Sequence, residues 1–397
     1  MSILIAHPTR QHSHRLAHAM QDAGLLHSYW TLLPDRRALA WLPVYLLPSA
    51  VSRHSLGFLP DNKVHALAGP LLFQKLVLRF PLVAVRQFGE WLAWAVFDRW
   101  VAKQLHQQRP GVVVCYEMCC AETFRVAKAS GIICVLDAAA CHYAMRDKIF
   151  GAEGYGGDTW AGKRLRQRKQ EEITLADRII CVSELARQSY IDAGVDADRI
   201  VVNTLGCDIT KFAPRSDLLR TGAPRFVFVG MPVNHKGFDL LVANYKRLLA
   251  HYHDAELHVV GDPVGLGELA GDSRIHIHGK LPHDRLGTLL AQMDCTVLPS
   301  RLDSFGMVVV ESLAAGVPVI VSDHVGASEA IMENKNGWVV PAGDEEALFQ
   351  RMLVCCENVE KVRLMKTACA DSARLYDWSF YSRRAVEIFS RLSGNFH

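Results

Sequence analysis

The chain has 397 residues, of which 50% are hydrophobic and 21% charged. This composition excludes intrinsic disorder and provides for two domains that each bury a core. The net charge is +3, divided into +6 over residues 1–200 and −3 over the rest, which is too weak and diffuse for nucleic-acid binding. A modestly basic first half would suit an anionic acceptor or an anionic membrane surface.

The eleven cysteines are odd in number and lie mostly in apolar runs, which predicts reduced core thiols rather than a disulfide framework. Cys115, Cys119 and Cys120 cluster after a predicted strand, but no second Cys or His pair stands at metal-ligand spacing, so no metal site is predicted. The N-terminus lacks a signal-peptide layout, and no apolar run reaches transmembrane length. We therefore expect a cytoplasmic protein. If it binds a membrane, we expect peripheral binding at the inner face.

The first half begins with a short apolar run, Ile3–Ala6, which predicts a buried strand. Ser13 is a predicted N-cap for a helix that ends at Ala23. His14 and His18 share one face of that helix, and we interpret them as surface or pocket-lining side chains rather than metal ligands.

Residues 36–110 are rich in Trp and Leu with scattered Arg, and Phe88–Leu105 predicts a long amphipathic helix. Two interpretations stay open. The preferred one is helices packed on a sheet. The other is a basic, aromatic surface that lies on a bilayer interface, with contributions from Ala40–Leu47 and Leu71–Phe80.

Strand and helix patterns then alternate up to residue 202, interrupted by a basic, glycine-bearing stretch, Arg146–Lys169. Alternation of this kind indicates βαβ units and an open parallel sheet. Such sheets bind ligands at the carboxyl ends of their strands. Asp137, His142, Ser183 and the loop after Ala6 are all expected there.

A turn-rich break at Asn203–Asp208 and a linker at Pro214–Pro224 precede a second alternation, which leads to a helical pattern at Trp378–Leu392. We expect a first domain over residues 1–205 and a second over 206–375. We expect the helix of about 376–397 to pack back on the first domain.

The second alternation ends with an apolar strand, Cys295–Leu298, and the stretch Pro299–Gly326, which continues it as loop, helix, turn and strand. A glycine-flanked helix start presents free N–H groups and a positive dipole end, which suit a phosphate. Asp303 lies in the loop, and Glu311 lies about one turn inside the helix. Taken alone, the pattern is equally consistent with an ordinary βαβ unit carrying surface acids. Lys236, at a glycine-flanked helix start, could meet a diphosphate, although such a lysine is usually only solvated.

In this order, the motifs resemble the retaining glycosyltransferases of family four. The resemblance covers residues 175–345 well and residues 1–175 loosely. Its motifs are Val182-Ser183, Gly206-Cys207-Asp208, Gly230 with Lys236-Gly237, Gly279, and Pro299-Ser300 followed by Asp303-Ser304-Phe305-Gly306, Glu311 and Ala315-Gly316-Val317-Pro318.

The resemblance implies an α/β protein of GT-B fold, with two Rossmann-like domains facing each other across a cleft. The second domain would hold a nucleotide-sugar donor and the first an acceptor. Asp303 and the following backbone would bind the donor sugar and β-phosphate, Glu311 the ribose hydroxyls, and Lys236 the diphosphate. The resemblance also places His142 near the reacting sugar and the backbone of Lys280 and Leu281 at the base. The remaining residues that it places at the donor are Gly230, Ser304, Phe305, Gly306, Met307 and Val308.

The chain departs from the family pattern at three places. Met231 replaces an Arg that usually follows the glycine, Asp303 replaces a Glu, and the usual glycine-rich first loop is Pro8-Thr9-Arg10-Gln11. We hypothesise that Arg10 supplies the missing charge on the donor. Asp196-Ala197-Asp198 has the spacing of a metal-binding Asp-x-Asp motif, but its setting predicts a turn.

The expected function is a metal-independent retaining hexosyltransferase without a cofactor. It would use a nucleotide-diphosphate sugar and a saccharide or lipid-linked acceptor, in surface polysaccharide biosynthesis. A GT-B nucleotide-sugar epimerase and a non-catalytic donor-binding or scaffold protein stay open as alternatives.

Overall fold

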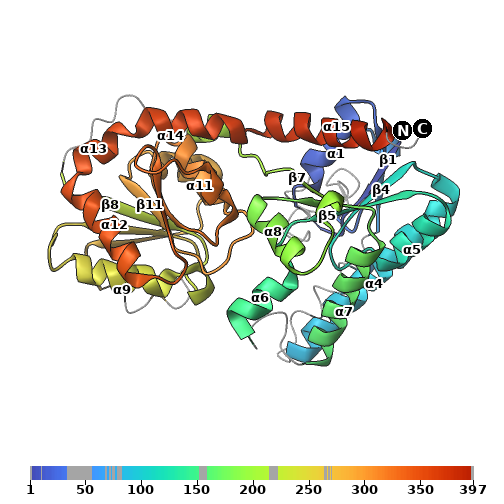
Figure 1. Cartoon of the computed structure of the whole chain (residues 1–397), viewed down its shortest axis with the longest axis horizontal. Coiled ribbons are helices and arrows are strands. Elements are labelled where there is room, and N and C mark those ends of the chain that lie inside the picture. Colours follow the sequence, from blue (N-terminus) through green and yellow to red (C-terminus); the bar gives the residue numbers. More distant parts are fainter. Residues whose placement is uncertain are drawn as a thin grey trace, which may run out of the picture. The chain divides into compact units, whose positions relative to one another are not determined.

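The computed structural model describes residues 2–9, 11–33, 56–67, 69–70, 73, 77, 83–151, 159–213, 222–262, 266, 269 and 271–394. The chain divides into two compact units. Unit 1 comprises Met1–Cys181, Ser189–Asn203 and Ser382–His397, and unit 2 comprises Val182–Gln188 and Thr204–Tyr381. Each unit contains a parallel sheet with helices beside it (Figure 1).

Within its described part, unit 1 has a seven-stranded sheet in the order β3-β2-β1-β4-β5-β6-β7. Every strand pair in it is parallel. The strands are β1 Ile3–Ala6, β2 Leu26–Thr31, β3 Val64–Ala66, β4 Val112–Tyr116, β5 Ile133–Ala138, β6 Arg178–Cys181 and β7 Ile200–Val202. The predicted strands are confirmed, whereas β2 and β3 are additional. Polar residues such as Ser28 interrupt the apolar run of β2, and this hid the strand from a reading by hydrophobicity.

The helices that begin in unit 1 are α1 Ser13–Asp22, α4 Val83–Gln108, α5 Ala121–Ala129, α6 Tyr143–Phe150 and α7 Trp160–Leu175, with the 3₁₀ turns η3 Asp61–Lys63 and η5 Ala197–Arg199. α8 Glu184–Asp192 crosses the boundary between the units. The described residues of the basic stretch 146–169 are mostly helical, in α6 and α7. One prediction was wrong here. The N-cap of α1 is His12, and Ser13 Oγ lies 3.0 Å from the Tyr29 hydroxyl instead of capping the helix.

The predicted helix Phe88–Leu105 lies inside α4, which contacts α5 and α7. Phe97, Val101 and Leu105 are buried, so the packing interpretation is confirmed for this face. The other segments named for residues 36–110, Ala40–Leu47 and nearly all of Leu71–Phe80, lie outside the described residues. Among the described residues, no helix combines the length and the apolar character that a bilayer crossing requires.

The described part of unit 2 has a six-stranded parallel sheet in the order β10-β9-β8-β11-β12-β13. The strands are β8 Arg225–Val229, β9 Glu256–Val260, β10 Ile275–Gly279, β11 Cys295–Leu298, β12 Val319–Ser322 and β13 Gly337–Val340. The helices are α9 Phe238–Leu248, α10 His283–Leu290, α11 Met307–Ala314, α12 Glu345–Glu357, α13 Val359–Leu364 and α14 Lys366–Ala373, with the 3₁₀ turns η6 Ile209–Phe212, η7 Asn234–Lys236, η8 Gly326–Ala330 and η9 Arg374–Tyr376. The last helix, α15 Trp378–Gly394, begins in unit 2 and ends in unit 1, where Arg384 donates a 3.0 Å hydrogen bond to the carbonyl of Val202.

The order of the strands in unit 2 decides where the predicted motifs lie. Gly230 follows β8, Lys280 follows β10 and Pro299 follows β11. Since all these strands are parallel, the three loops emerge at the same edge of the sheet.

Two smaller predictions are confirmed. All eleven cysteines are buried and unbridged. Asp196 caps the 3₁₀ turn η5 through a 3.0 Å hydrogen bond from the Asp198 N–H, so Asp196-Ala197-Asp198 is a turn.

Candidate functional site

The candidate site in unit 2 is built on a close backbone contact between the loop after β8 and the loop after β11. Gly237 ends the first loop with a left-handed φ of 69°, and a Cβ added there would lie 1.9 Å from the carbonyl oxygen of Pro299. Only glycine accepts both the conformation and the contact. Gly237 therefore holds the two loops together at this point.

Arg301 fastens the same two loops with its side chain and its backbone. Its guanidinium makes a bidentate ion pair with Asp239, both bonds at 2.7 Å, and its N–H donates to the carbonyl of His235 at 2.9 Å. Bidentate Arg–carboxylate pairs fix orientation as well as distance. The backbone between Asn234 and Phe238 is thus held against the loop after β11.

This arrangement places Lys236 beside Asp303. Lys236 Nζ lies 2.6 Å from Asp303 Oδ2, and both side chains are only about a fifth to a quarter exposed, 24% and 21%. The two predicted catalytic residues of this unit therefore meet in an ion pair.

The loop from Asp303 to Gly306 is anchored on its other side. The N–H of Asp303 donates to the carbonyl of His324, and its carbonyl accepts from the N–H of Gly326, both at 2.9 Å. Ser183 Oγ donates to the carbonyl of Ser304 at 2.7 Å. With its carbonyls engaged in this way, the loop has a defined path into α11.

α11 begins directly after this loop, as predicted. Its N-cap, Gly306, has φ 86°, and a Cβ at this residue would lie 2.5 Å from Cγ1 of Val325. Met307 and Val308 form the first turn, whose N–H groups lack carbonyl partners within the helix. Together with the dipole end, this helix start can accept an anion.

Glu311 lies one turn further along α11 and is 7% exposed. Within the described part of the chain, no side chain or backbone group gives its carboxylate a hydrogen bond or an ion pair. Burial raises the pKa of Glu311 to about 7. A buried carboxylate of this kind is costly to keep without donors, so a ligand that donates hydrogen bonds to it would be stabilised there.

The loop after β10 reaches the same edge of the sheet. The N–H of Gly261 donates to the carbonyl of Gly279 at 3.0 Å, and a Cβ at Gly261 would lie 1.9 Å from the carbonyl oxygen of Gly230. Lys280, with Leu281 next to it, has a side chain that is 75% exposed and pairs with Asp262 at 2.7 Å. The side chain of Lys280 thus points to solvent, and the backbone of this loop is what the site can use.

The two remaining predicted residues lie elsewhere in the chain. His142, in unit 1, caps α6 by accepting from the N–H of Ala144 at 3.2 Å, and its own N–H donates to Ser189 Oγ at 2.8 Å. Burial, with a smaller effect of nearby Lys169, lowers the pKa of His142 to about 4, so its imidazole is neutral at pH 7. Arg10 lies outside the described residues.

The sequence reasoning missed part of the carboxyl edge of the unit 1 sheet. His12 Nε2 lies 2.9 Å from Asp137 Oδ1, with both side chains buried. His7 stacks edge-on against Tyr116, and burial lowers the pKa of His7 to about 4. The available signal was that His7, Tyr116 and Asp137 all lie at the carboxyl ends of predicted strands. Arg301 was missed as well, because the partners of its guanidinium are 62 or more residues away.

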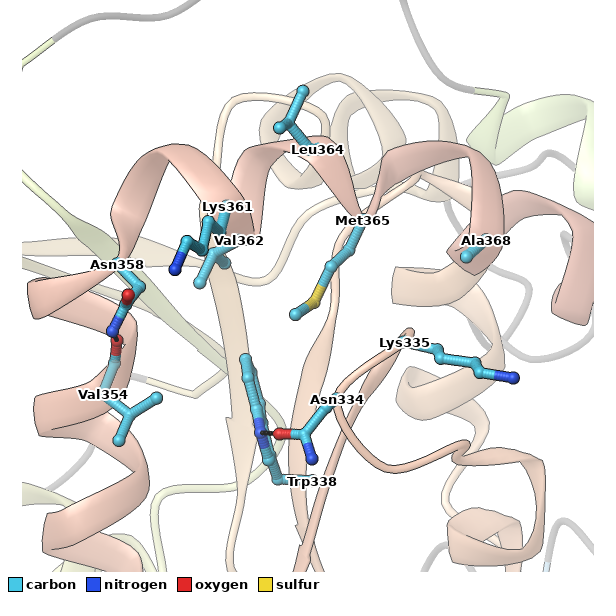
Figure 2. A pocket seen from close by; sticks show the side chains of 10 residues that line it. All are labelled: Asn334, Lys335, Trp338, Val354, Asn358, Lys361, Val362, Leu364, Met365 and Ala368. Atoms are coloured by element: carbon cyan, nitrogen blue, oxygen red, sulfur yellow. Dashed lines mark hydrogen bonds between the residues drawn. The ribbon is translucent and has the colours of Figure 1, made fainter.

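A cavity of about 540 Å³ lies in another part of unit 2, between β13 and the helices α12 to α14 (Figure 2). Trp338 forms one wall and donates to Asn334 at 2.8 Å, while Leu364 points outward. Its lining residues are Asn334, Lys335, Trp338, Val354, Asn358, Lys361, Val362, Leu364, Met365 and Ala368. None of these is a predicted site residue or a carboxylate, so the cavity is not the candidate site.

The comparisons with known proteins agree with this geometry. The family model described as Glycosyl transferases group 1 matches residues 223–358. The chain is 28% identical over 251 residues to the D-inositol 3-phosphate glycosyltransferase of Nocardia farcinica, covering 58% of this chain and 56% of that one. It is 29% identical over 226 residues to the phosphatidyl-myo-inositol mannosyltransferase of Mycolicibacterium smegmatis, covering 54% and 57%. The matched region thus spans little more than half of each relative.

Solved structures match over nearly the whole chain. The sucrose-phosphate synthase of Thermosynechococcus elongatus gives a TM-score of 0.71 at 16% identity, covering 100% of both chains. The Anabaena protein HepE in complex with UDP and glucose gives 0.66 at 15% identity, covering 98% of this chain and 99% of that one. At such identities the likeness concerns the fold, which is two Rossmann-like domains.

The predicted resemblance to family-four glycosyltransferases is thereby confirmed. Residues 223–358 match the glycosyl transferases group 1 model, and the fold of the chain is of the GT-B type.

Proposed function

We propose that this chain transfers a sugar from a nucleotide-diphosphate sugar to a saccharide or lipid-linked acceptor, in the biosynthesis of a surface polysaccharide. The observation that carries the proposal is Glu311, a buried carboxylate that receives no hydrogen bond from the described residues. Ribose hydroxyls are donors of the right kind for it. The anion-accepting start of α11 precedes it by one turn, so a nucleotide with its diphosphate at the helix start could turn its ribose toward Glu311.

Each group at this edge has a role in the proposed reaction. Breaking the glycosyl–phosphate bond builds negative charge on the leaving oxygens. The first-turn N–H groups of α11 and the ammonium of Lys236 would stabilise that charge, and fixed donors of this kind are a large source of rate enhancement. Asp303 would hold Lys236 in place and contact the donor sugar. The family resemblance, rather than a position at this edge, assigns His142 of unit 1 to the donor sugar, and its imidazole, neutral at pH 7, would add no charge there.

We further propose a hexosyl donor, retention of the anomeric configuration and a metal-independent transfer. The names of the relatives support a hexosyl group, since one of them is a mannosyltransferase and HepE is a complex with UDP and glucose. Retention rests on the family resemblance. Metal independence is supported by the N–H groups of the α11 start and by Lys236, which can stabilise phosphate charge without an ion. The placement of Asp196-Ala197-Asp198 in a turn supports it as well.

The test is turnover of a panel of nucleotide-diphosphate sugars, with and without acceptor extracts. We expect slow donor hydrolysis that Lys236→Ala and Glu311→Ala abolish, while Lys246→Ala, an exposed lysine of α9, leaves it unchanged. Proton NMR of the first product then gives the anomeric configuration, and addition of a chelator tests metal independence. Interconversion of donor sugars without acceptor would point to an epimerase, and no turnover of any donor would point to a binding or scaffold protein.

We also propose a cytoplasmic location with peripheral binding to the inner face of the membrane. Trp160 is 55% and Phe88 is 47% exposed, and the guanidinium of Arg164 lies 5.7 Å from the ring centroid of Trp160. Exposed aromatic rings beside basic groups suit an anionic bilayer interface. Flotation with anionic vesicles should decrease in Trp160→Ala and persist in Leu364→Ser, which removes an even more exposed apolar side chain of unit 2. Absence of flotation in the unaltered chain would exclude the membrane role.

A further inference from the structure

A second group of chemically active side chains lies on strands β8, β9 and β10 of unit 2. Strand pairing places His276 opposite His258, and Arg225 opposite Glu256. Neighbouring strands are about 4.8 Å apart, and alternate residues share a face. Glu256 and His258 therefore lie on one face of β9, with His276 beside them on the edge strand β10.

The ligand atoms of three of these side chains converge. Glu256 Oε2 lies 3.3 Å from His258 Nε2 and 4.0 Å from His276 Nε2, and all three atoms lie within 4.8 Å of one another. Two atoms that bind one zinc ion at about 2.1 Å can be at most about 4.2 Å apart. Both distances to Glu256 satisfy that limit. The His276 side chain is 40% exposed, so a small rotation brings its nitrogen within the limit for His258 as well.

The surroundings of His258 resemble the outer shell of a metal site. His258 Nδ1 lies 2.9 Å from Nε2 of His278, which leaves Nε2 of His258 directed at Glu256. Metal-binding histidines usually engage their second nitrogen in such a hydrogen bond, which fixes the tautomer and the ring orientation. Arg225 pairs with the same carboxylate oxygen, Glu256 Oε2, that lies nearest the two histidines. A bound ion would share the Glu256 carboxylate with this cation, so a small rotation of the carboxylate that gives each of them one oxygen would accompany binding.

From this geometry we infer that Glu256, His258 and His276 form a binding site for a divalent transition-metal ion, with zinc as the best match. Two imidazoles and one carboxylate suit zinc, nickel or copper and disfavour magnesium and calcium, which prefer oxygen ligands. The partly exposed position leaves the fourth tetrahedral place for water. The ion would join the edge strand β10 to β9. It takes no part in the proposed sugar transfer, and the inference does not depend on that function.

The test is a titration of the full chain with Zn²⁺ by calorimetry and with Co²⁺ by visible absorption, which reports coordination geometry. We expect one tight site per chain. His278→Ala removes an outer-shell partner and should lower the zinc affinity about 10- to 100-fold. His276→Ala removes a proposed ligand and should lower the zinc affinity at least as much. His253→Ala removes an exposed histidine of the same unit outside the cluster and should bind as tightly as the unaltered chain.

The His276 and His278 side chains are only partly buried, so both variants should fold, and circular dichroism checks this. A rise in melting temperature with Zn²⁺ that is lost in His276→Ala would support the site through linkage. The inference is wrong if His276→Ala and His278→Ala bind zinc as tightly as His253→Ala, or if the unaltered chain gives no Co²⁺ spectrum. Donor turnover should be unchanged in these histidine variants. A failure of the zinc titration is therefore distinguishable from a failure of the proposed function, which the turnover assay measures.

Discussion

Lys236 Nζ and Asp303 Oδ2 lie 2.6 Å apart, so the one lysine assigned to the diphosphate already has a carboxylate partner. The pair joins positions 67 residues apart, across two loops held by Gly237 and Arg301. The family pattern has Glu where this chain has Asp303. A nucleotide diphosphate that enters this site must share Lys236 with Asp303 or displace it.

The first prediction concerns Asp303→Asn. Because both side chains are partly exposed, the ion pair contributes only about 0–1 kcal/mol to the free energy of unfolding, so the melting temperature should change little. Removal of a negative charge beside the diphosphate should raise the affinity for a nucleoside diphosphate by about tenfold. Sugar transfer should fall at the same time. Calorimetry and a turnover assay measure the two effects.

Lys236→Ala is the matched comparison for that experiment and should weaken nucleoside diphosphate binding. If Asp303→Asn weakened binding as much as Lys236→Ala does, the carboxylate would be needed to position the ammonium. The pair would then act as a unit rather than in competition with the ligand.

The second prediction concerns the ligand of Glu311. Hydrogen bonds to a charged group contribute about 1.5–3 kcal/mol, so Glu311→Gln should lower nucleotide-sugar affinity by about 10- to 100-fold. Glu333→Gln, which alters an exposed glutamate of the same unit, should have no effect. Equal affinity in both variants would remove Glu311 from the binding site.

The third prediction is a pH dependence of stability that also originates at Glu311. Its folded pKa of about 7 lies above the usual 4.5 because of burial. Its contribution to stability is therefore complete below pH 4.5 and is lost as the pH rises through 7, by about 3 kcal/mol. Glu311→Gln should raise the melting temperature at pH 8 and flatten its decline between pH 5 and 8. Part of the decline should remain, since burial also raises the pKa of Glu172 to about 7.

Nucleotide-sugar affinity should show the opposite pH trend. The proposed contact needs Glu311 as a carboxylate, so binding should weaken as the pH falls below about 7. A nucleotide sugar suits this measurement better than a nucleoside diphosphate. The terminal phosphate of a nucleoside diphosphate has a second pKa of about 6 and would itself titrate in this pH range. Affinity that is independent of pH between 5.5 and 8 would contradict the prediction.

The fourth prediction separates a steric contact from backbone strain. Gly237 and Gly343 both have left-handed φ values, 69° and 82°, but only Gly237 faces another chain segment, the Pro299 carbonyl at 1.9 Å from an added Cβ. Gly343→Ala should cost only the conformational penalty, about 1–2 kcal/mol. Gly237→Ala should cost more and should also weaken nucleotide binding, because the two loops must separate. Similar melting temperatures for the two variants would contradict the assigned contact.

Much of the fold follows from local sequence patterns, because the periods of strands and helices depend on near neighbours. The alternation of apolar strands with helices predicted both parallel sheets, and the run from Cys295 to Gly326 predicted β11, α11 and β12 with their connecting turns. Where polar residues interrupt a strand, as in β2, the pattern failed. The order of the motifs likewise sufficed to recognise the family.

By itself, then, the sequence determined the strand–helix alternation, the glycine at each loop and the chemical groups available at the sheet edge. Tertiary structure alone decided which of those groups meet. The pairing of Lys236 with Asp303, the isolation of Glu311 and the convergence of His258 with His276 all depend on strand order and register, which bring together residues that are distant along the chain. No local pattern contains that information, because burial and partnership are properties of the packed unit rather than of any one segment.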